Sequence, residues 1–67
     1  MHLGKFTVFV WQAPDSTYSL ELYNVHGDVR FCKAGMSLRT AKINAALIAQ
    51  KLIKHGLKTE VRLRYFS

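Results

Sequence analysis

The sequence has one cysteine, one proline and four acidic residues among its 67 residues. A single cysteine, Cys32, excludes an intrachain disulfide, and with it the class of small secreted domains that disulfides hold together. No apolar run approaches the roughly 18 residues that a membrane-spanning helix requires, and the N-terminus lacks a basic segment followed by a long apolar one. These absences predict a cytoplasmic protein in a reducing compartment, with no membrane partner.

The patterns of common catalytic and metal sites are also missing. His2, His26, Cys32 and His55 have no zinc-site spacing. The chain has no glycine-rich loop for a phosphate, and its acidic residues form no paired motif for acid–base chemistry. A chain this short also has little room for a pocket that excludes water. We therefore expect a protein that is not an enzyme, with no catalytic residue, no metal and no cofactor.

The length suits one small domain over residues 1–67. Folding at this size buries only about 60% of the surface of the unfolded chain, so stability is marginal without help. Oligomerisation is one form of such help.

Positive charge is in excess and is unevenly distributed along the chain. The formal net charge is +6, and residues 30–67 carry nine of the ten lysines and arginines against one glutamate, a net charge of +8. A basic half of this kind attracts polyanions, chiefly nucleic acid, through a long-range interaction that salt weakens. The alternative is a basic surface that serves solubility alone.

The clearest helical pattern runs from Ser37 to Gly56. Apolar residues at helical spacing form one stripe that requires a sheet to cover it: Leu38, Ala41, Ala45, Ile48, Ala49 and Leu52. Ser37 predicts an N-cap, because its hydroxyl can accept a hydrogen bond from an amide of the first turn. Gly56 can take the left-handed conformation that ends a helix, and Leu57 can fold back onto the last turn.

Two apolar residues, Ile43 and Leu47, project from the opposite side of this predicted helix. They are one turn apart and form a small patch. One interpretation is scattered surface hydrophobes, which are normal in soluble proteins. The other is a contact strip for a second copy of the chain or for a protein partner.

Four segments read as strands, at residues 5–11, 17–23, 28–33 and 58–66. The first is apolar on both alternating faces, which is typical of a central strand. The second and fourth alternate apolar and polar residues, as half-buried strands do. Residues 34–36 are expected to be a short connector into the helix.

A two-residue hairpin turn is predicted at residues 26–27, where glycine tolerates positive φ. Closing the hairpin there pairs Leu22 with Phe31 and Tyr23 with Arg30, so that core residues face core residues. The element order β-β-β-α-β defines an α+β fold. A right-handed crossover through the helix places the fourth strand parallel to the first, in a mixed four-stranded sheet of order 3-2-1-4 with the helix on one face.

Alternation divides the strand residues between two faces of this sheet. The residues expected to meet the helix are Phe6, Val8, Val10, Leu20, Leu22, Val29, Phe31, Val61, Leu63 and Tyr65. The opposite face is expected to stay uncovered and to present Phe9, Trp11, Tyr23 and Phe66 among Thr7, Ser19, Glu21, Arg30, Cys32, Glu60, Arg62 and Arg64.

Aromatic rings and arginines together suggest a nucleic-acid site on the uncovered face. Phe9, Trp11 and Tyr23 are predicted to stack on unpaired bases. The arginines predicted to neutralise phosphates are Arg30, Arg62 and Arg64. The same composition also arises in strands that simply pack well, and in protein interfaces, where aromatic residues and arginine are enriched.

Three strands followed by a helix, over roughly residues 5–55, resemble the architecture of integrase amino-terminal and plant AP2-type DNA-binding domains. The resemblance lies in element order, and the predicted strand at 58–66 departs from it. In general character the chain also resembles the small accessory proteins of phages and mobile elements.

Two functions therefore remain open at this point. One is a small basic module that binds DNA or RNA through the aromatic and arginine-bearing sheet face. The other is a protein-interaction or homodimeric accessory protein that uses the same face or the strip formed by Ile43 and Leu47.

Overall fold

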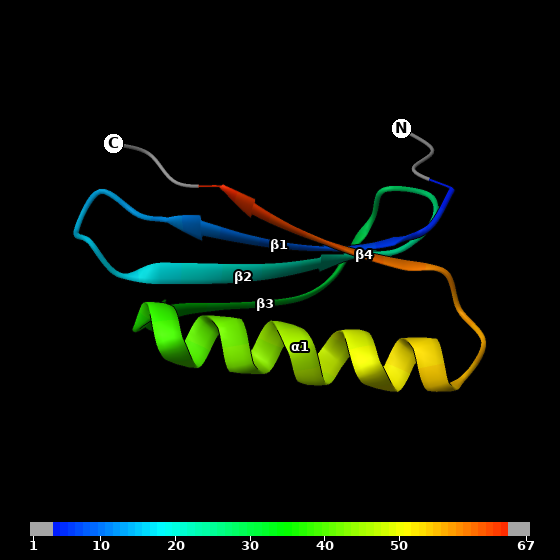
Figure 1. Ribbon diagram of the computed structural model, residues 1–67. Helices are drawn as coiled ribbons and strands as arrows, with labels where there is room; N and C mark the ends of the chain where they lie inside the picture. Colours follow the sequence, from blue (N-terminus) through cyan, green and yellow to red (C-terminus); the bar gives the residue numbers. More distant parts are fainter. Residues whose placement is uncertain (1–3, 65–67) are drawn as a thin grey trace.

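The computed structural model describes residues 4–64, which form one sheet and one helix (Figure 1). The elements are β1 (Phe6–Gln12), β2 (Tyr18–Tyr23), β3 (Val29–Met36), α1 (Leu38–Lys54) and β4 (Thr59–Arg64). This order confirms the predicted β-β-β-α-β arrangement of an α+β fold. Tyr65 and Phe66, which belong to the predicted fourth strand at 58–66, lie outside the described residues.

Residues 4–64 build a four-stranded mixed sheet in the order β3-β2-β1-β4, as predicted. The central strand, β1, pairs antiparallel with β2 and parallel with β4. Val8, for example, lies opposite Leu22 on one side and Val61 on the other. Because β1 has a strand on each side, its apolar residues on the helix side find partners in both neighbours.

Both ends of α1 are formed as their residues predict. The Ser37 side chain accepts a hydrogen bond from the backbone amide of Thr40 at 3.2 Å. At the C-terminus, Gly56 has φ 79°, and the amides of Gly56 and Leu57 donate to the carbonyls of Ile53 and Leu52. These two bonds form a Schellman motif, which satisfies carbonyls that the end of the helix would otherwise leave without donors.

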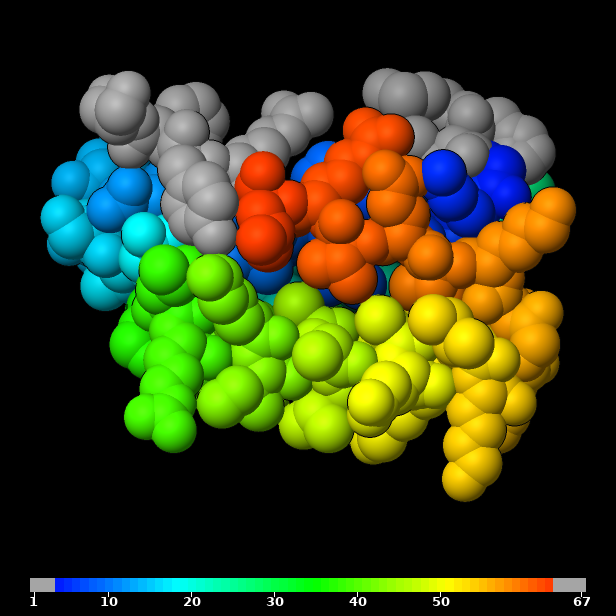
Figure 2. All heavy atoms as spheres, viewed as in Figure 1, coloured from blue at the N-terminus to red at the C-terminus, as the bar shows by residue number. Residues whose placement is uncertain are grey.

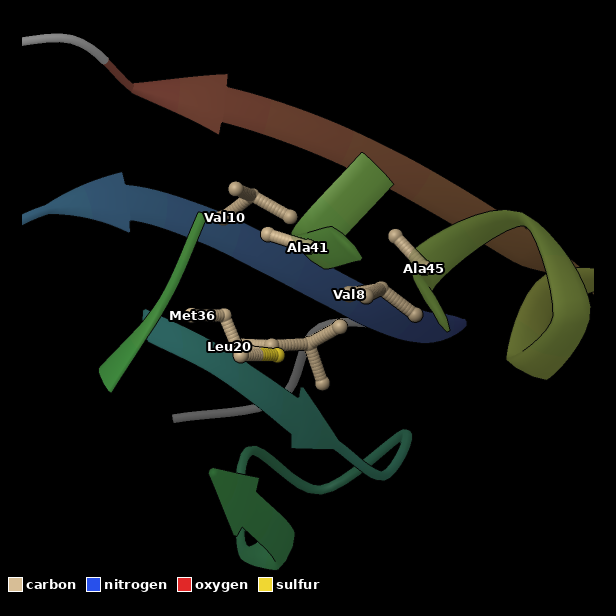
Figure 3. Close-up of a cluster of buried hydrophobic side chains, with 6 residues drawn as sticks. All are labelled: Val8, Val10, Leu20, Met36, Ala41 and Ala45. Atoms are coloured by element: carbon tan, nitrogen blue, oxygen red, sulfur yellow. The ribbon is translucent and has the colours of Figure 1, made fainter. Parts of the chain in front are cut away.

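The core is small and lies between α1 and the two middle strands (Figure 3). Its members are Val8, Val10, Leu20, Met36, Ala41 and Ala45. Alanines on the inner side of α1 let the helix approach the sheet closely, so that valine and leucine side chains from the sheet fill the space between. A core with so few large side chains supports only modest stability.

The third strand is longer than predicted, because residues 34–36 belong to β3 and do not form a connector. The pairing of β2 with β3 shifts between the Tyr18–Met36 and Leu20–Lys33 pairs, which places one extra residue in β3. Gly35 has φ 73° at this bulge, a conformation that glycine adopts without strain. The bulge re-aims the end of the strand, and the side chain of Met36 enters the core.

The predicted two-residue turn at 26–27 is wrong in length. The Asn24 amide donates to the carbonyl of Asp28, so three residues form the loop, and the Asn24 side chain accepts from the amides of His26 and Asp28. An asparagine that bonds its following backbone in this way selects the longer loop.

The altered loop changes the register of the strand that follows. The Leu22–Phe31 pair is confirmed, but Tyr23 lies opposite Val29, and Arg30 is the extra residue between these two pairs. Val29 is therefore on the sheet face away from α1, where Arg30 was expected.

The helix covers the middle of the sheet and leaves its margins exposed. It packs against β1, β2 and β4. Phe31, Val61 and Leu63 are at positions on the helix side, as predicted, but 45%, 40% and 45% of their surface remains exposed. A helix is about 10–12 Å across, whereas four strands about 4.8 Å apart separate the outer strands by about 14 Å, so one helix is too narrow to cover them all.

No helix among residues 4–64 is long and apolar enough to cross a membrane.

The core predicts that replacing a buried leucine destabilises the protein far more than replacing an exposed one. Leu20 is fully buried, whereas Leu47 on α1 is 51% exposed. We expect Leu20→Ala to lower the free energy of unfolding by about 2–5 kcal/mol, because it removes buried methyl groups and leaves a cavity. Leu47→Ala should change it by no more than about 0.5 kcal/mol. Urea denaturation followed by circular dichroism measures both values, and equal losses in the two variants would contradict this core.

Candidate nucleic-acid interface

The face of the sheet away from α1, which we call the open face, gathers five of the six residues predicted to bind nucleic acid. In the strand register, Phe9 lies opposite Glu21 and Arg62, Trp11 opposite Ser19 and Arg64, and Tyr23 opposite Thr7. The open face consists of Thr7, Phe9, Trp11, Ser19, Glu21, Tyr23, Val29, Cys32, Glu60, Arg62 and Arg64.

Glu21 holds two of the aromatic residues in place. The Trp11 indole Nε1 donates to Glu21 Oε1 at 2.9 Å, and the Tyr23 hydroxyl donates to Glu21 Oε2 at 3.3 Å. Burial, with the charge of Glu21 next, raises the pKa of the Tyr23 phenol above its ordinary value. The phenol therefore stays neutral and acts as a donor, and both rings are oriented before any ligand arrives.

The ring of Phe9 is in contact with two neighbouring side chains on the open face. It meets the ring of Tyr23 edge to face, with centroids 5.3 Å apart, and the Arg62 guanidinium lies 5.9 Å from its centroid. Thr7 and Ser19 are buried although they are on the open face, because the larger side chains around them cover them. The aromatic residues thus form a packed layer in which the Phe9 ring is partly covered.

The charges of the open face balance one another. Arg62 Nε donates to Glu60 Oε1 at 2.9 Å, and Lys5 Nζ lies 2.6 Å from Glu60 Oε2. These two cations, Arg62 first, lower the pKa of the Glu60 carboxyl to about 2. Among the side chains that the structure describes here, Lys5 and Arg62 are matched by Glu21 and Glu60, so a phosphate approaching Arg62 competes with a carboxylate already bound to it.

The two remaining predicted arginines have different positions. Arg30 is exposed and is the extra residue in β3, so it has no paired position on the open face. Arg64 is the last residue of β4 and lies opposite Trp11 in the register, and its side chain is outside the described part of the structure.

A hollow of about 460 Å³ opens at the end of β1. Its described lining is Trp11, Gln12, Ala13, Pro14 and Ser16. The turn beside it is fixed by Asp15, whose carboxylate accepts hydrogen bonds from the hydroxyl and the amide of Thr17, which lower its pKa. Trp11, one of the predicted stacking residues, therefore borders this open space.

A second charged surface lies away from the open face, over α1, β3 and the segment between α1 and β4. We call it the basic surface, and its cations are Arg30, Lys33, Arg39, Lys42, Lys51, Lys54 and Lys58. All seven are exposed, and the ion pairs found within residues 4–64 involve none of them. In the space-filling view, α1 forms one whole side of the molecule, with long side chains projecting away from the sheet (Figure 2).

One feature of the sequence indicates this surface, namely a long stretch that has lysines and arginines but no acidic residue. No acidic residue occurs between Asp28 and Glu60. Sequence reasoning located the positive charge in this half of the chain but assigned phosphate contacts to the sheet arginines, because it could not foresee that Glu60 binds Arg62.

Both residues of the predicted strip on α1 are exposed, and one of them borders a groove. Ile43 and Leu47 each have 51% of their surface exposed. Leu47 borders a groove between α1 and β3, whereas Ile43 is not among the residues that line it.

The fold and the two surfaces define a small α+β domain with one basic side. Comparison with family models, curated proteins and solved structures finds no match for this chain. Within residues 4–64, no group of three histidine, cysteine or acidic side chains is placed to hold a metal ion.

The ion pairs of Glu60 predict a measurable titration. Since its pKa is lower in the folded protein than the ordinary 4.5, these contacts stabilise the fold above about pH 4.5, and this contribution is lost as the pH falls through about 2. We expect carbon-detected NMR to show Glu60 titrating near pH 2 and Arg62→Ala to raise that pKa. Arg39→Ala, which removes a cation from the basic surface, should leave it unchanged. An ordinary Glu60 pKa in the wild-type protein would contradict the described contacts.

Proposed function

We propose that this protein is a non-enzymatic module that binds nucleic acid through the phosphate backbone, using the basic surface. The observation that carries the proposal is the group of seven exposed cations on α1, β3 and the segment before β4, none of which is in the ion pairs of residues 4–64. Such cations bind phosphates and release counterions from the nucleic acid, which gives affinity that falls as salt rises.

The charge distribution favours the basic surface over the open face. On the open face, Arg62 is already bound to Glu60, and the Glu21 carboxylate repels a phosphate. On the basic surface, a phosphate meets exposed ammonium and guanidinium groups with no carboxylate between residues 29 and 59. Water and salt weaken Coulomb interactions with distance, so a phosphate responds mainly to the charges close to it. Close to the basic surface these charges are cations without carboxylates, and the attraction there should exceed that at the open face.

The length of α1 suits contact with several phosphates. Arg39 and Lys54 lie on the outer side of the helix, and 15 residues at about 1.5 Å each separate them by about 22 Å along its axis. That distance corresponds to about six base pairs of duplex. The contacts are to the backbone, so we expect binding with little sequence preference.

The open face is the alternative binding site for nucleic acid. There Trp11, beside the hollow at the end of β1, would stack on a base, with Phe9 and Tyr23 supporting it and Arg30, Arg62 and Arg64 near phosphates. The observation that favours this placement is that Glu21 orients the Trp11 and Tyr23 rings in advance.

Charge removal on each surface tests the proposal. We expect the double variant Arg39→Ala/Lys54→Ala to bind short labelled single-stranded and duplex oligonucleotides more weakly. The slope of log affinity against log salt concentration should fall by about 1 for each phosphate that the variant no longer neutralises. Fluorescence anisotropy at several salt concentrations measures both quantities. Arg62→Ala is the matched control and should change the slope little.

Three outcomes would count against the proposal as stated. A smaller slope in Arg62→Ala but not in the helix variant would place the site on the open face. Equal slopes in all three proteins would mean that neither surface binds phosphate. Absence of binding to any oligonucleotide at low salt, with folded protein confirmed by circular dichroism, would remove the nucleic-acid function.

A further inference from the structure

A groove of about 200 Å³ separates α1 from the edge strand β3. It is lined by Leu20, Phe31, Lys33, Met36, Asn44, Leu47, Ile48 and Lys51. Five of these residues are apolar, and Phe31 and Leu47 are each about half exposed. The groove exists because α1 packs over β1, β2 and β4 and leaves Phe31 and Lys33, on the helix side of β3, exposed.

The outer edge of β3 borders the same groove. In the sheet order of the described strands, β3 is at one end, so the backbone groups on its outer side face no further strand. Residues 31–33 pair regularly with β2, and the register shifts at both ends of this stretch. A short extended segment can add to such an edge by main-chain hydrogen bonds, while its alternate side chains enter the adjacent groove.

The positions along β3 specify what those alternate side chains must be. Phe31 and Lys33 are two residues apart and both are on the helix side, opposite Leu22 and Leu20. A strand added beside β3 would place one side chain against Phe31 and Leu47, and another near Lys33 and Lys51. The first position favours an apolar side chain and the second favours a carboxylate.

We propose that this groove binds a short extended segment of an acidic protein partner, which adds as a strand to β3 and carries an apolar and an acidic residue two positions apart. Charge complementarity selects this occupant, because two exposed lysines line a groove whose other residues, Asn44 excepted, are apolar. The groove shares Lys33 and Lys51 with the basic surface, but the inference rests on the apolar lining and the free edge of β3, which the proposed nucleic-acid function does not use.

A second copy of the chain fits the groove poorly. Lys33 is on the helix side of an edge strand, and an inward-pointing charge of this kind discourages pairing with another sheet. Pairing two copies through β3 would bring two such lysines together, with a net charge of +6 on each chain. A partner carboxylate at that position removes the repulsion and replaces it with an ion pair.

Selection from a display library of short random peptides tests the proposal directly. We expect enriched peptides to carry an apolar residue and an aspartate or glutamate two positions apart, and to shift the amide NMR signals of β3 and the facing side of α1. Leu47→Glu should weaken their binding about tenfold or more. Lys33→Glu should change the preference at the acidic position to lysine or arginine.

The matched control is Ile43→Glu, which makes the same charge change one helical turn away, at a residue with the same 51% exposure that does not line the groove. It should leave peptide binding unchanged, as should Arg39→Ala/Lys54→Ala. The proposal is overturned if no peptide is enriched, if Ile43→Glu and Leu47→Glu weaken binding equally, or if the enriched peptides lack acidic residues. A wild-type dimer in sedimentation that Leu47→Glu dissociates would identify a second copy as the occupant and would also overturn it.

Discussion

The close contact between the alanine side of α1 and the helix-facing side of β1 and β2 is the constraint on which the rest of the structure depends. Ala41, Ala45 and Ala49 bring the helix backbone near the sheet, and Val8, Val10 and Leu20 fill the space between. A single helix packed this closely covers the central strands and leaves both margins exposed. The apolar groove beside β3 and the exposed side chains of β4 follow from that geometry.

The few acidic residues are largely committed to local contacts. Asp15 fixes the turn after β1, Glu21 orients Trp11 and Tyr23, and Glu60 binds Lys5 and Arg62. Two of these three lie on the open face, which is therefore ordered and close to neutral. No acidic residue occurs in the sequence between Arg30 and Lys58, and all the cations of the basic surface are exposed. Segregation of charge between the two sides of the molecule is what favours the helix side for a polyanion.

Strand β3 has features that discourage its exposed edge from pairing with another sheet, and other features that allow a short partner segment to bind there. Its two irregularities and the inward position of Lys33 discourage long pairing with another sheet. The same irregularities leave residues 31–33 regular, next to a groove that holds both apolar surface and positive charge. A short acidic segment satisfies these conditions better than a long or basic one.

The sequence by itself determined the order of the elements, the ends of the helix, the strand order and the central place of β1. These depend on local patterns: alternation along strands, a repeat of about 100° along the helix, Ser37 as N-cap and Gly56 beyond the C-terminus. The Leu22–Phe31 pair followed from the same alternation. Only the tertiary structure decided that Arg30 and Gly35 lie at irregularities, that Met36 enters the core and that Phe31 stays half exposed. It alone also decided that Glu60 binds Lys5 and Arg62 and that Glu21 binds Trp11 and Tyr23, because such contacts depend on distances between side chains on neighbouring strands, which no local pattern encodes.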